Sequence, residues 1–325
     1  MLSIKKYNKT YLQTWNDFIH LANNGTIFHN RLFLSYHLDR TFLDHSLLFF
    51  NKKELIAVFP AVIHIENNKT IIYSHPGASY GGFVIKNKLE FAIIDCIINE
   101  LTKYCKHNNF QSIFLINTPD IYFNKSDQSL EYLLQWHGYR QKELYISHVV
   151  NLETDNLYCL LKKRKKRYLN NAINEMNLFF LESYDFDDFY NLLIINKKKY
   201  STKPTHSLKE LKHLKKILPK SIKLILTKKN NLIIGGTLLF LLNKKISLVF
   251  YNIIDEKFRN TQLASFQLFN CMKITKNLGL KIIDFGVSHT PELKNPYAPK
   301  KSLIKFKEQF GARGVIRTAY QKEIN

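Results

Sequence analysis

The order of strands and helices repeats along the chain. The segment Lys53–Val58 (KELIAV) is matched by Asn230–Gly235 (NNLIIG), and Phe110–Leu115 (FQSIFL) is matched by Gly279–Asp284 (GLKIID). The paired residues lie 177 positions apart in the first match and 169 in the second. A near-constant offset through matching element types indicates a duplicated α/β domain, with two similar patterns arising by chance as the alternative.

The length and composition allow two such domains. The chain has 325 residues, of which 45% are hydrophobic, and its 18 Tyr and 24 Phe exclude disorder as the main state. A length prior of about 150 residues per domain allows two domains or one large one. We therefore expect mixed α/β domains at residues 1–150 and 151–325, with a border near 148–155.

Hydrophobic periodicity predicts the elements of each half. In the first half, helices are expected at 11–21, 31–40, 89–106 and 126–136, and strands at 46–50, 55–59, 70–73, 83–85 and 112–116. In the second half, helices are expected at 155–176, 186–198, 208–218 and 262–277, and strands at 222–227, 232–241, 246–253 and 281–285. The buried face of the helix at 89–106 is predicted to consist of Phe91, Ile94, Ile98, Leu101 and Cys105.

Several features favour a cytoplasmic protein. The longest apolar stretches, Leu55–Ile65 and Leu232–Leu242, have 11 residues each, whereas a membrane span needs about 20. The N-terminal residues show no apolar signal segment. Four cysteines without CxxC spacing are typical of reduced, structural thiols; they are Cys96, Cys105, Cys159 and Cys271.

The charge balance is strongly basic. With 48 Lys and Arg against 26 Asp and Glu, the net charge is +22, which suits nucleic acid, anionic lipid or a phosphate-rich ligand. The alternative is codon drift in an A/T-rich genome, because the chain has 40 Lys and 31 Asn but only 8 Arg. Codon drift alone does not explain the run Lys162–Arg167 (KKRKKR), because six cations stand next to one another there. We expect most of this run to face solvent or a cleft and to bind a polyanion, while Leu157, Leu161, Tyr168 and Ala172 form the buried stripe of the same helix.

A glycine-rich loop, His75–Gly82 (HPGASYGG), lies between two predicted strands. Glycines let a backbone approach a ligand and expose its N–H groups, although an ordinary turn explains them as well. The candidates for substrate binding in this loop are His75, Ser79, Tyr80, Gly81 and Gly82. The loop also contains GxSxG, but a nucleophile elbow needs a helix directly after the serine, and a strand is predicted there instead. A nucleophilic Ser79 is therefore not favoured.

Two segments of the second half are further candidates. Arg259 lies between a predicted strand and a long helix, where a pyrophosphate can bind, although the usual glycines are missing and a solvated loop with a helix cap at Thr261 is the alternative. Asp284 ends a strand, a common place for site residues, or is a turn carboxylate. The 12 histidines show no metal-binding spacing, so no metal is expected, and neither a Walker loop nor GxGxxG occurs.

These segments, in this order, resemble the FemAB-like branch of the GNAT acyltransferase superfamily over nearly the whole chain. The matching pieces are Thr26–His29, Ser74–Gly82, the basic helix leading to Tyr168 and Ala172, Tyr251 with Arg259, Asp284–Gly286 and Phe306–Gly311. The resemblance implies an α/β fold of tandem duplicated GNAT-like domains that face a shared cleft. It also implies a last strand, within residues 313–325, that pairs with the first domain. No coiled-coil arm is visible, and the pyrophosphate motif lacks its glycine.

The resemblance implies transfer of an acyl or aminoacyl group to an amine of a cell-envelope precursor, sugar or small molecule. The donor would be acyl-CoA or aminoacyl-tRNA, with no tightly bound cofactor. Lys307, which matches the lysine of the family's FK motif beside Phe306, would contact the donor or the oxyanion, although a solvated helix face shared with Lys305 is the default interpretation of these lysines. Asp284 would be a base or orient the amine, and Tyr251, Arg259 and Phe306 would bind substrate.

A second class of function stays open. A non-catalytic tandem GNAT module would bind RNA or an anionic membrane through its basic helix at Lys162–Arg167. tRNA and peripheral contact with an anionic membrane are therefore candidate partners under both hypotheses, and DNA is not expected.

Overall fold

A computed structural model describes residues 2–175, 178–199, 201–289 and 298–324. The chain forms two compact units, one from residues 2–145 and 316–324 and the other from residues 146–289 and 298–315. Both units combine sheets with helices, so the predicted α/β class is confirmed.

Unit 1 has a four-stranded sheet in the order β1-β3-β4-β7 and a run of strands in the order β15-β8-β6-β5-β2. The first set comprises β1 (Leu2–Lys6), β3 (Leu47–Asn51), β4 (Glu54–Phe59) and β7 (Val84–Ile85). The second comprises β2 (Leu43–Asp44), β5 (Val62–Glu66), β6 (Lys69–Ser74), β8 (Ser112–Ile116) and β15 (Arg313–Glu323). The helices are α1 (Leu12–Leu21), α2 (Arg31–Leu34), α3 (Phe91–His107) and α4 (Ser129–Trp136).

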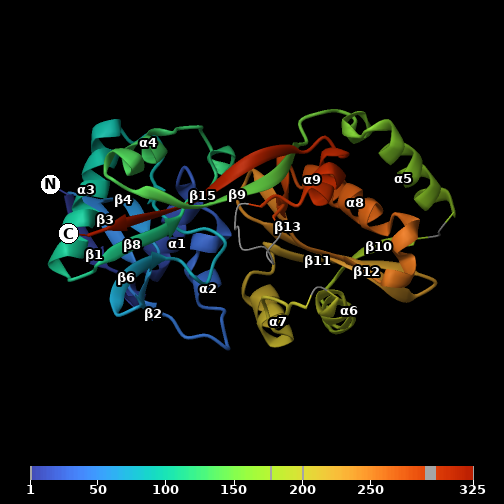
Figure 1. Ribbon diagram of the computed structural model, residues 1–325, viewed down its shortest axis with the longest axis horizontal. Coiled ribbons are helices and arrows are strands. Elements are labelled where there is room, and N and C mark those ends of the chain that lie inside the picture. Colours follow the sequence, from blue (N-terminus) through green and yellow to red (C-terminus); the bar gives the residue numbers. More distant parts are fainter. Residues whose placement is uncertain (1, 176–177, 200, 290–297, 325) are drawn as a thin grey trace. The chain divides into compact units, whose positions relative to one another are not determined.

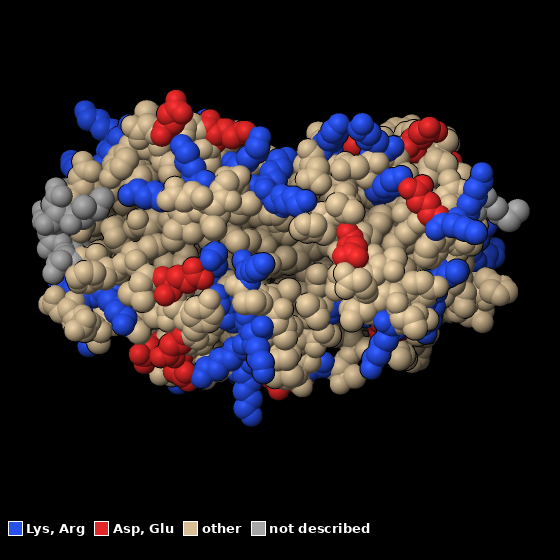
Figure 2. Space-filling view, turned by 180° about the vertical axis from the view of Figure 1, so that it is seen from behind, with Lys and Arg blue, Asp and Glu red and all other residues tan. Residues whose placement is uncertain are grey.

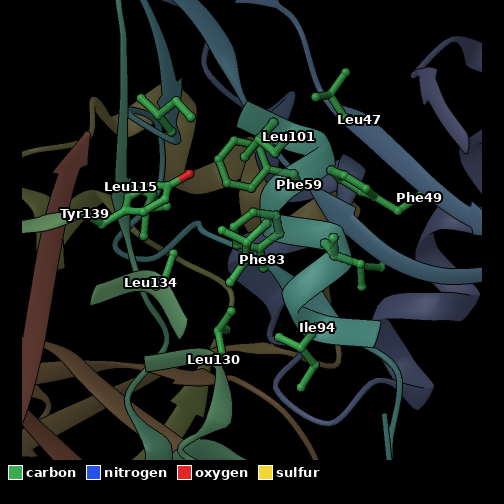
Figure 3. Packing of buried hydrophobic residues seen from close by; sticks show 14 of the residues in the cluster. Leu47, Phe49, Phe59, Phe83, Ile94, Leu101, Leu115, Leu130, Leu134 and Tyr139 are labelled. Atoms are coloured by element: carbon green, nitrogen blue, oxygen red, sulfur yellow. The ribbon is translucent and has the colours of Figure 1, made fainter. Parts of the chain in front are cut away.

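The core of unit 1 lies between α3, α4 and the strands (Figure 3). Phe59 and Phe83 contact each other there with ring centroids 4.8 Å apart. The buried residues of α3 are Ile94, Ile97, Ile98, Leu101 and Cys105. The prediction was wrong for Phe91, which is 50% exposed because it is the first residue of the helix, and it omitted Ile97.

Unit 2 has six strands in the order β10-β11-β12-β13-β14-β9. They are β10 (Leu178–Ser183), β11 (Ile222–Lys229), β12 (Leu232–Leu241), β13 (Ile246–Ile254), β14 (Ile282–Val287) and β9 (Arg140–Asn151). Its helices are α5 (Lys163–Glu175), α6 (Asp187–Lys198), α7 (Leu208–Ile217), α8 (Leu263–Asn277) and α9 (Lys301–Glu308). In Figure 1, α6 and α7 cover one face of this sheet, and α5, α8 and α9 lie on the other.

The strands β13 and β14 separate partway along their length. They run parallel and pair at three positions, the last being Leu248 with Asp284. Beyond this pair, β13 continues to Ile254 and β14 to Val287. In the same region the register of β14 with β9 shifts between Asp284 and Val287, as at a β-bulge. The end of β14 can thus present backbone groups to other elements.

The order of elements repeats between the units. In unit 1, β6 and β8 are parallel and α3 lies between them in the sequence, and in unit 2, β13 and β14 are parallel with α8 between them. The final strand of each repeat is exchanged. The strand β9 follows α4 but pairs with β14, whereas β15 follows α9 but pairs with β8 through Ala319–Glu323. The chain therefore passes between the units inside these two long strands.

Two helices are shorter than predicted by more than five residues. The helix α2 ends at Leu34 rather than at 40, because the chain then turns to bury Tyr36 and to let the His37 ring bond to Gly77 O over 2.8 Å. The helix α5 begins at Lys163 rather than at 155, because 157–160 form a separate 3-10 turn in which the Asn156 side chain caps Tyr158 N. Its predicted end, residue 176, lies outside the described residues.

None of the helices described is long and apolar enough to cross a membrane. The four cysteines are free thiols, with Cys105 and Cys271 buried. Figure 2 shows Lys and Arg side chains scattered widely over the visible face, with fewer Asp and Glu among them.

Candidate functional site

Lys307 is buried in unit 2, with 4% of its surface exposed. Its Nζ donates to Gly286 O over 2.6 Å, to Val287 O over 3.1 Å and to Ser288 Oγ over 2.8 Å. All three acceptors belong to the end of β14 or the residue after it, where β14 has left β13. The expectation of a solvated helix face was therefore wrong for Lys307, whereas Lys305 is exposed as that expectation requires.

Burial lowers the pKa of Lys307 to about 8, although the charge of Asp284 opposes this shift. A lysine with such a pKa exchanges its proton near neutral pH, and its ammonium is a strong donor toward a developing negative charge.

Asp284 is fully buried beneath the same turn. Its Oδ1 accepts from Ser147 Oγ over 2.5 Å and from the backbone N–H of Gly286 over 2.6 Å. Gly286 has φ of +78°, a conformation that glycine adopts without strain. Asp284 therefore fixes the turn whose carbonyl oxygen Lys307 contacts, so the two predicted catalytic residues meet through Gly286.

A histidine completes this cluster. Ser288 Oγ lies 3.2 Å from His148 Nδ1. Because Lys307 donates to the same oxygen, the Ser288 hydroxyl can direct its own proton to the histidine. Burial and then the charge of Lys307 lower the pKa of His148, which favours the neutral ring that accepts this bond. We name the group Lys307, Ser288, His148, Asp284 and Ser147 the β14 cluster.

A second lysine of unit 2 is buried next to Phe306. Lys165, from the basic run, is 1% exposed and donates from Nζ to Ser265 Oγ in the first turn of α8 over 2.8 Å. The ring centroids of Phe306 and Phe310 lie 4.7 and 5.2 Å from the same nitrogen. Burial, with a contribution from Arg164, lowers the pKa of Lys165 to about 8. Lys165 is therefore the buried exception in a run of which most faces solvent, as expected.

The rest of the basic helix follows the expectation more closely. Leu157, Leu161 and Ala172 are buried, and Tyr168 is partly buried. The exposed cations of the run are Lys162, Lys163, Arg164 and Arg167, and Lys166 is half-buried.

The segment before α8 is polar and exposed. Arg259 pairs with Glu256 over 3.1 Å and leaves 67% of its side chain exposed. The N-cap residue of α8 is Gln262, which has φ of +61°, so the helix cap expected at Thr261 is displaced by one residue. Arg259 is available for a phosphate, but it does not contact the β14 cluster through any bond among the described residues.

Tyr251 lies on β13 and is 7% exposed. Its hydroxyl accepts from the backbone N–H of Thr205 over 3.0 Å, and burial raises its pKa. This contact joins β13 to the segment before α7. The Tyr251 hydroxyl is therefore already bonded to the backbone of unit 2.

The glycine-rich loop belongs to unit 1. Gly81 N donates to Ile116 O over 2.8 Å, and the His29 ring bonds to Gly81 O over 3.1 Å. Gly82 has φ of +74° and its N–H donates to Ser74 Oγ over 2.8 Å. Burial lowers the pKa of His75 to about 3, so this ring is neutral at physiological pH.

The tips of the same loop differ in exposure. Ser79 is partly exposed, while Tyr80 is buried with its hydroxyl 3.1 Å from that of Tyr122. The strand β7 follows the serine, so the geometry of a nucleophile elbow is absent from this loop.

The predicted residues thus lie in several places. In unit 2, Lys307 and Asp284 share the β14 cluster, Phe306 packs beside Lys165, and Arg259 and Tyr251 have other partners. The loop residues belong to unit 1. The predicted shared cleft stays a prediction. The sequence reasoning missed His148, Ser147, Ser288 and the buried position of Lys165. Among the residues that the structure describes, no three His, Cys, Asp or Glu side chains group closely enough to hold a metal ion.

Neither a protein-family model nor a curated protein matches the sequence. Solved structures do match. FemX has a TM-score of 0.76 at 12% identity, over 99% of this chain and 98% of FemX. A tandem GNAT protein from the clavulanic acid biosynthesis pathway has a TM-score of 0.58 at 7% identity, over 100% of this chain and 99% of that one. The C-terminal domain of a protein assigned as a lysylphosphatidylglycerol synthetase from Agrobacterium fabrum has a TM-score of 0.61 at 11% identity, over 97% of this chain and 92% of that one.

These matches span both units and agree with the repeated order of elements found along the chain. The chain therefore has the FemAB-like fold of two GNAT units in tandem, similar to that of FemX.

Proposed function

We propose that the protein is an N-acyltransferase that moves an acyl or aminoacyl group from an activated donor to an amine. The observation that carries the proposal is the β14 cluster, in which a buried lysine with a pKa of about 8 sits at the separated end of β14. The tandem GNAT fold supports it, because a parallel strand pair that separates can admit an extended ligand between its ends.

The reaction needs an amine to attack a carbonyl carbon, so that negative charge develops on the carbonyl oxygen. Lys307 would stabilise this oxyanion by exchanging one of its present acceptors for it. Asp284 would fix the turn at Gly286 by accepting a hydrogen bond from its backbone N–H. Ser288, which is bonded to His148, would hold the ammonium of Lys307 in place. The acceptor amine would lose its proton to solvent or to a neighbouring group. Collapse of the oxyanion would then break the bond between the carbonyl carbon and the donor and release the CoA thiol or the tRNA hydroxyl.

Donors of two kinds fit this scheme. The name of one structural neighbour mentions AcCoA, which supports an acyl-CoA donor, and that of another mentions lysylphosphatidylglycerol, which supports transfer of an aminoacyl group but names no donor. Both an acyl-CoA and an aminoacyl-tRNA carry phosphates, which the first turn of α8 and the exposed Arg259 would bind. Lys165 lies at that turn and would add positive charge there. An amine of a cell-envelope precursor, sugar or small molecule would be the acceptor, and His75, Ser79, Tyr80, Gly81, Gly82 and Tyr251 would contribute to its binding.

Mass spectrometry tests the proposal directly. The purified protein is incubated with acetyl-CoA or with a mixture of aminoacyl-tRNAs, together with envelope precursors and amino sugars, and the products are searched for an added acyl or aminoacyl mass. A product that forms with the wild type and is reduced in Lys307→Ala but not in Lys305→Ala supports the assignment. Equal turnover by both variants would contradict it.

The second candidate is a module that binds RNA or an anionic membrane without turnover. Its supporting observation is the exposure of four cations within six residues, Lys162, Lys163, Arg164 and Arg167. Salt-sensitive binding of tRNA or anionic vesicles, together with an absence of product under every donor condition, would favour this function over the transferase.

A further inference from the structure

Arg317 of β15 lies in unit 1 against two tyrosine rings. Its Cζ is 4.7 Å from the ring centroid of Tyr145 and 5.6 Å from that of Tyr80. Tyr80 belongs to the glycine-rich loop, and Tyr145 belongs to β9. Ring faces attract the charge of a guanidinium but do not satisfy its N–H groups.

One N–H donor of Arg317 is buried and has no acceptor among the described residues. This donor is Nε, and Arg317 takes part in no hydrogen bond or ion pair of its side chain within the described part of the chain. A buried donor without a partner costs about 1–3 kcal/mol. This cost is unusual for a residue whose only role is to stabilise the fold.

Arg31 in the same unit provides the comparison. It also lies over two rings, Tyr7 at 3.8 Å and Trp15 at 5.4 Å. In contrast to Arg317, it donates to Ser46 Oγ over 2.9 Å and forms an ion pair with Asp44. Arg31 therefore shows that an arginine with a structural role in this unit has acceptors for its N–H groups. Among the described residues, Arg317 has no such acceptors.

The groups around Arg317 are already engaged or neutral. The nearby carboxylate of Glu143 accepts from Tyr145 Oη–H over 2.6 Å, and Tyr80 is bonded to Tyr122. Burial and then Glu143 raise the pKa values of Tyr73 and Tyr145 to about 12, although the charge of Arg317 opposes this shift. No phenolate therefore balances the guanidinium at neutral pH, and the rings are held in place before any ligand arrives.

We propose that Arg317, supported by the rings of Tyr80 and Tyr145, binds an oxyanion of the acceptor, either a carboxylate or a phosphate. Such a group can accept from Nε and a terminal nitrogen at once, as planar oxyanions do with arginine. The assignment of this anion to the acceptor rests on the proposed function. The site itself rests on the unpaired donors of Arg317.

Binding of simple anions tests the site without turnover. Titration calorimetry of the full chain with inorganic phosphate and with succinate, at constant ionic strength, measures affinity for the two chemistries. Loss of a bidentate, charge-assisted contact weakens binding by at least about tenfold in Arg317→Gln, while Arg140→Gln, which changes an exposed arginine of β9, binds as the wild type does. The anion that binds more tightly identifies the group. Equal affinities of the wild type and Arg317→Gln for both anions would overturn the proposal.

Thermal unfolding without added anion provides a second readout. Arg317→Met keeps the apolar stem and removes the unpaired donors, so its Tm stays equal to that of the wild type or rises, whereas Arg31→Met lowers the Tm. A decrease in Arg317→Met as large as that in Arg31→Met would show a structural arginine and overturn the proposal. Because neither readout needs catalysis, anion binding that depends on Arg317 stands even if no transfer product is found.

Discussion

Lys165 Nζ donates to Ser265 Oγ over 2.8 Å, which ties the middle of the basic run to the first turn of α8. The same nitrogen lies over the rings of Phe306 and Phe310. Lys165 therefore differs from the exposed cations of its run because it is buried. Its ammonium lies at the first turn of α8, whereas the side chains of Lys163 and Arg167 face solvent.

The burial of Lys165 should make stability depend on pH. Its pKa of about 8 in the folded chain is below the usual 10.5, so the unfolded chain binds more protons between these values. The free energy of unfolding therefore rises with pH from about 8 to 10.5, by up to about 1.4 kcal/mol per pH unit for this group. Urea unfolding at several pH values should show a smaller rise in Lys165→Met than in Lys163→Met, the exposed control. Identical slopes in the two variants would contradict the burial of this charge.

The position of Lys165 could have been predicted from helical spacing. Leu161, Lys165 and Leu169 are four residues apart, which puts Lys165 on the buried stripe of the helix. The run of six cations predicts that Lys165 is exposed, whereas the helical spacing predicts that it is buried. The prediction followed the charge of the run. Elements with strong patterns, such as β12 and α8, were predicted within one residue of their bounds.

Other features depend on contacts that no local pattern encodes. The strand β9 begins with the polar stretch Arg140–Glu143 and has no clear alternation there, and its partner β14 comes more than a hundred residues later. In the β14 cluster, His148 meets Ser288 across 140 positions of sequence. Lys307 was identified through a family resemblance, and Asp284 also through its place at the end of a predicted strand. The residues that hold them depend on tertiary packing.

Replacement of Lys307 should affect both activity and stability. Loss of an oxyanion donor typically lowers kcat by about 10²–10³, and Lys307→Ala also leaves Gly286 O, Val287 O and Ser288 Oγ without their donor. We expect a loss of about 1–3 kcal/mol in the free energy of unfolding. Lys305→Ala, on the exposed face of α9, should change stability by less than about 0.5 kcal/mol. Similar results for both variants in turnover and urea unfolding would remove Lys307 from the site.

The exposed cations of the basic helix should govern polyanion binding. Replacing Lys162, Lys163, Arg164 and Arg167 with Gln is expected to reduce the salt dependence of tRNA binding, because fewer phosphates are neutralised and fewer counterions are released. The slope of log K against log salt should become shallower by about 0.7–0.9 for each phosphate that is no longer neutralised. The control replaces Lys52, Lys53, Lys86 and Lys88 in unit 1 with Gln, which changes the net charge equally. An equal change of slope in both quadruple variants would attribute the binding to net charge alone.

Acid should destabilise unit 1 through His29. This ring is fully buried, and its burial lowers its pKa to about 4 despite bonds to Gly81 and Thr26 that raise it. The folded pKa is below the usual 6.5, so the free energy of unfolding falls as the pH decreases from about 6.5 to 4. His29→Gln should show a smaller fall over this range in urea unfolding, whereas His107→Gln, at an exposed position, should follow the wild type. A wild-type profile in both variants would show that His29 does not titrate abnormally.

The glycine-rich loop should not tolerate a side chain at Gly81. A Cβ at this position would lie 2.3 Å from the backbone oxygen of Ser74, which cannot move without disturbing the end of β6. Gly81→Ala is therefore expected to lower the free energy of unfolding by more than about 2 kcal/mol, as overpacking of a rigid site does. The comparison is Gly138→Ala, where a Cβ would meet no atom within 4 Å. Only the φ of +83° opposes this change, and we expect it to lower the free energy of unfolding by about 1–2 kcal/mol. Chemical unfolding of both variants distinguishes the two causes. If Gly81→Ala is no less stable than Gly138→Ala, the close approach of the loop to Ser74 is not what requires glycine there.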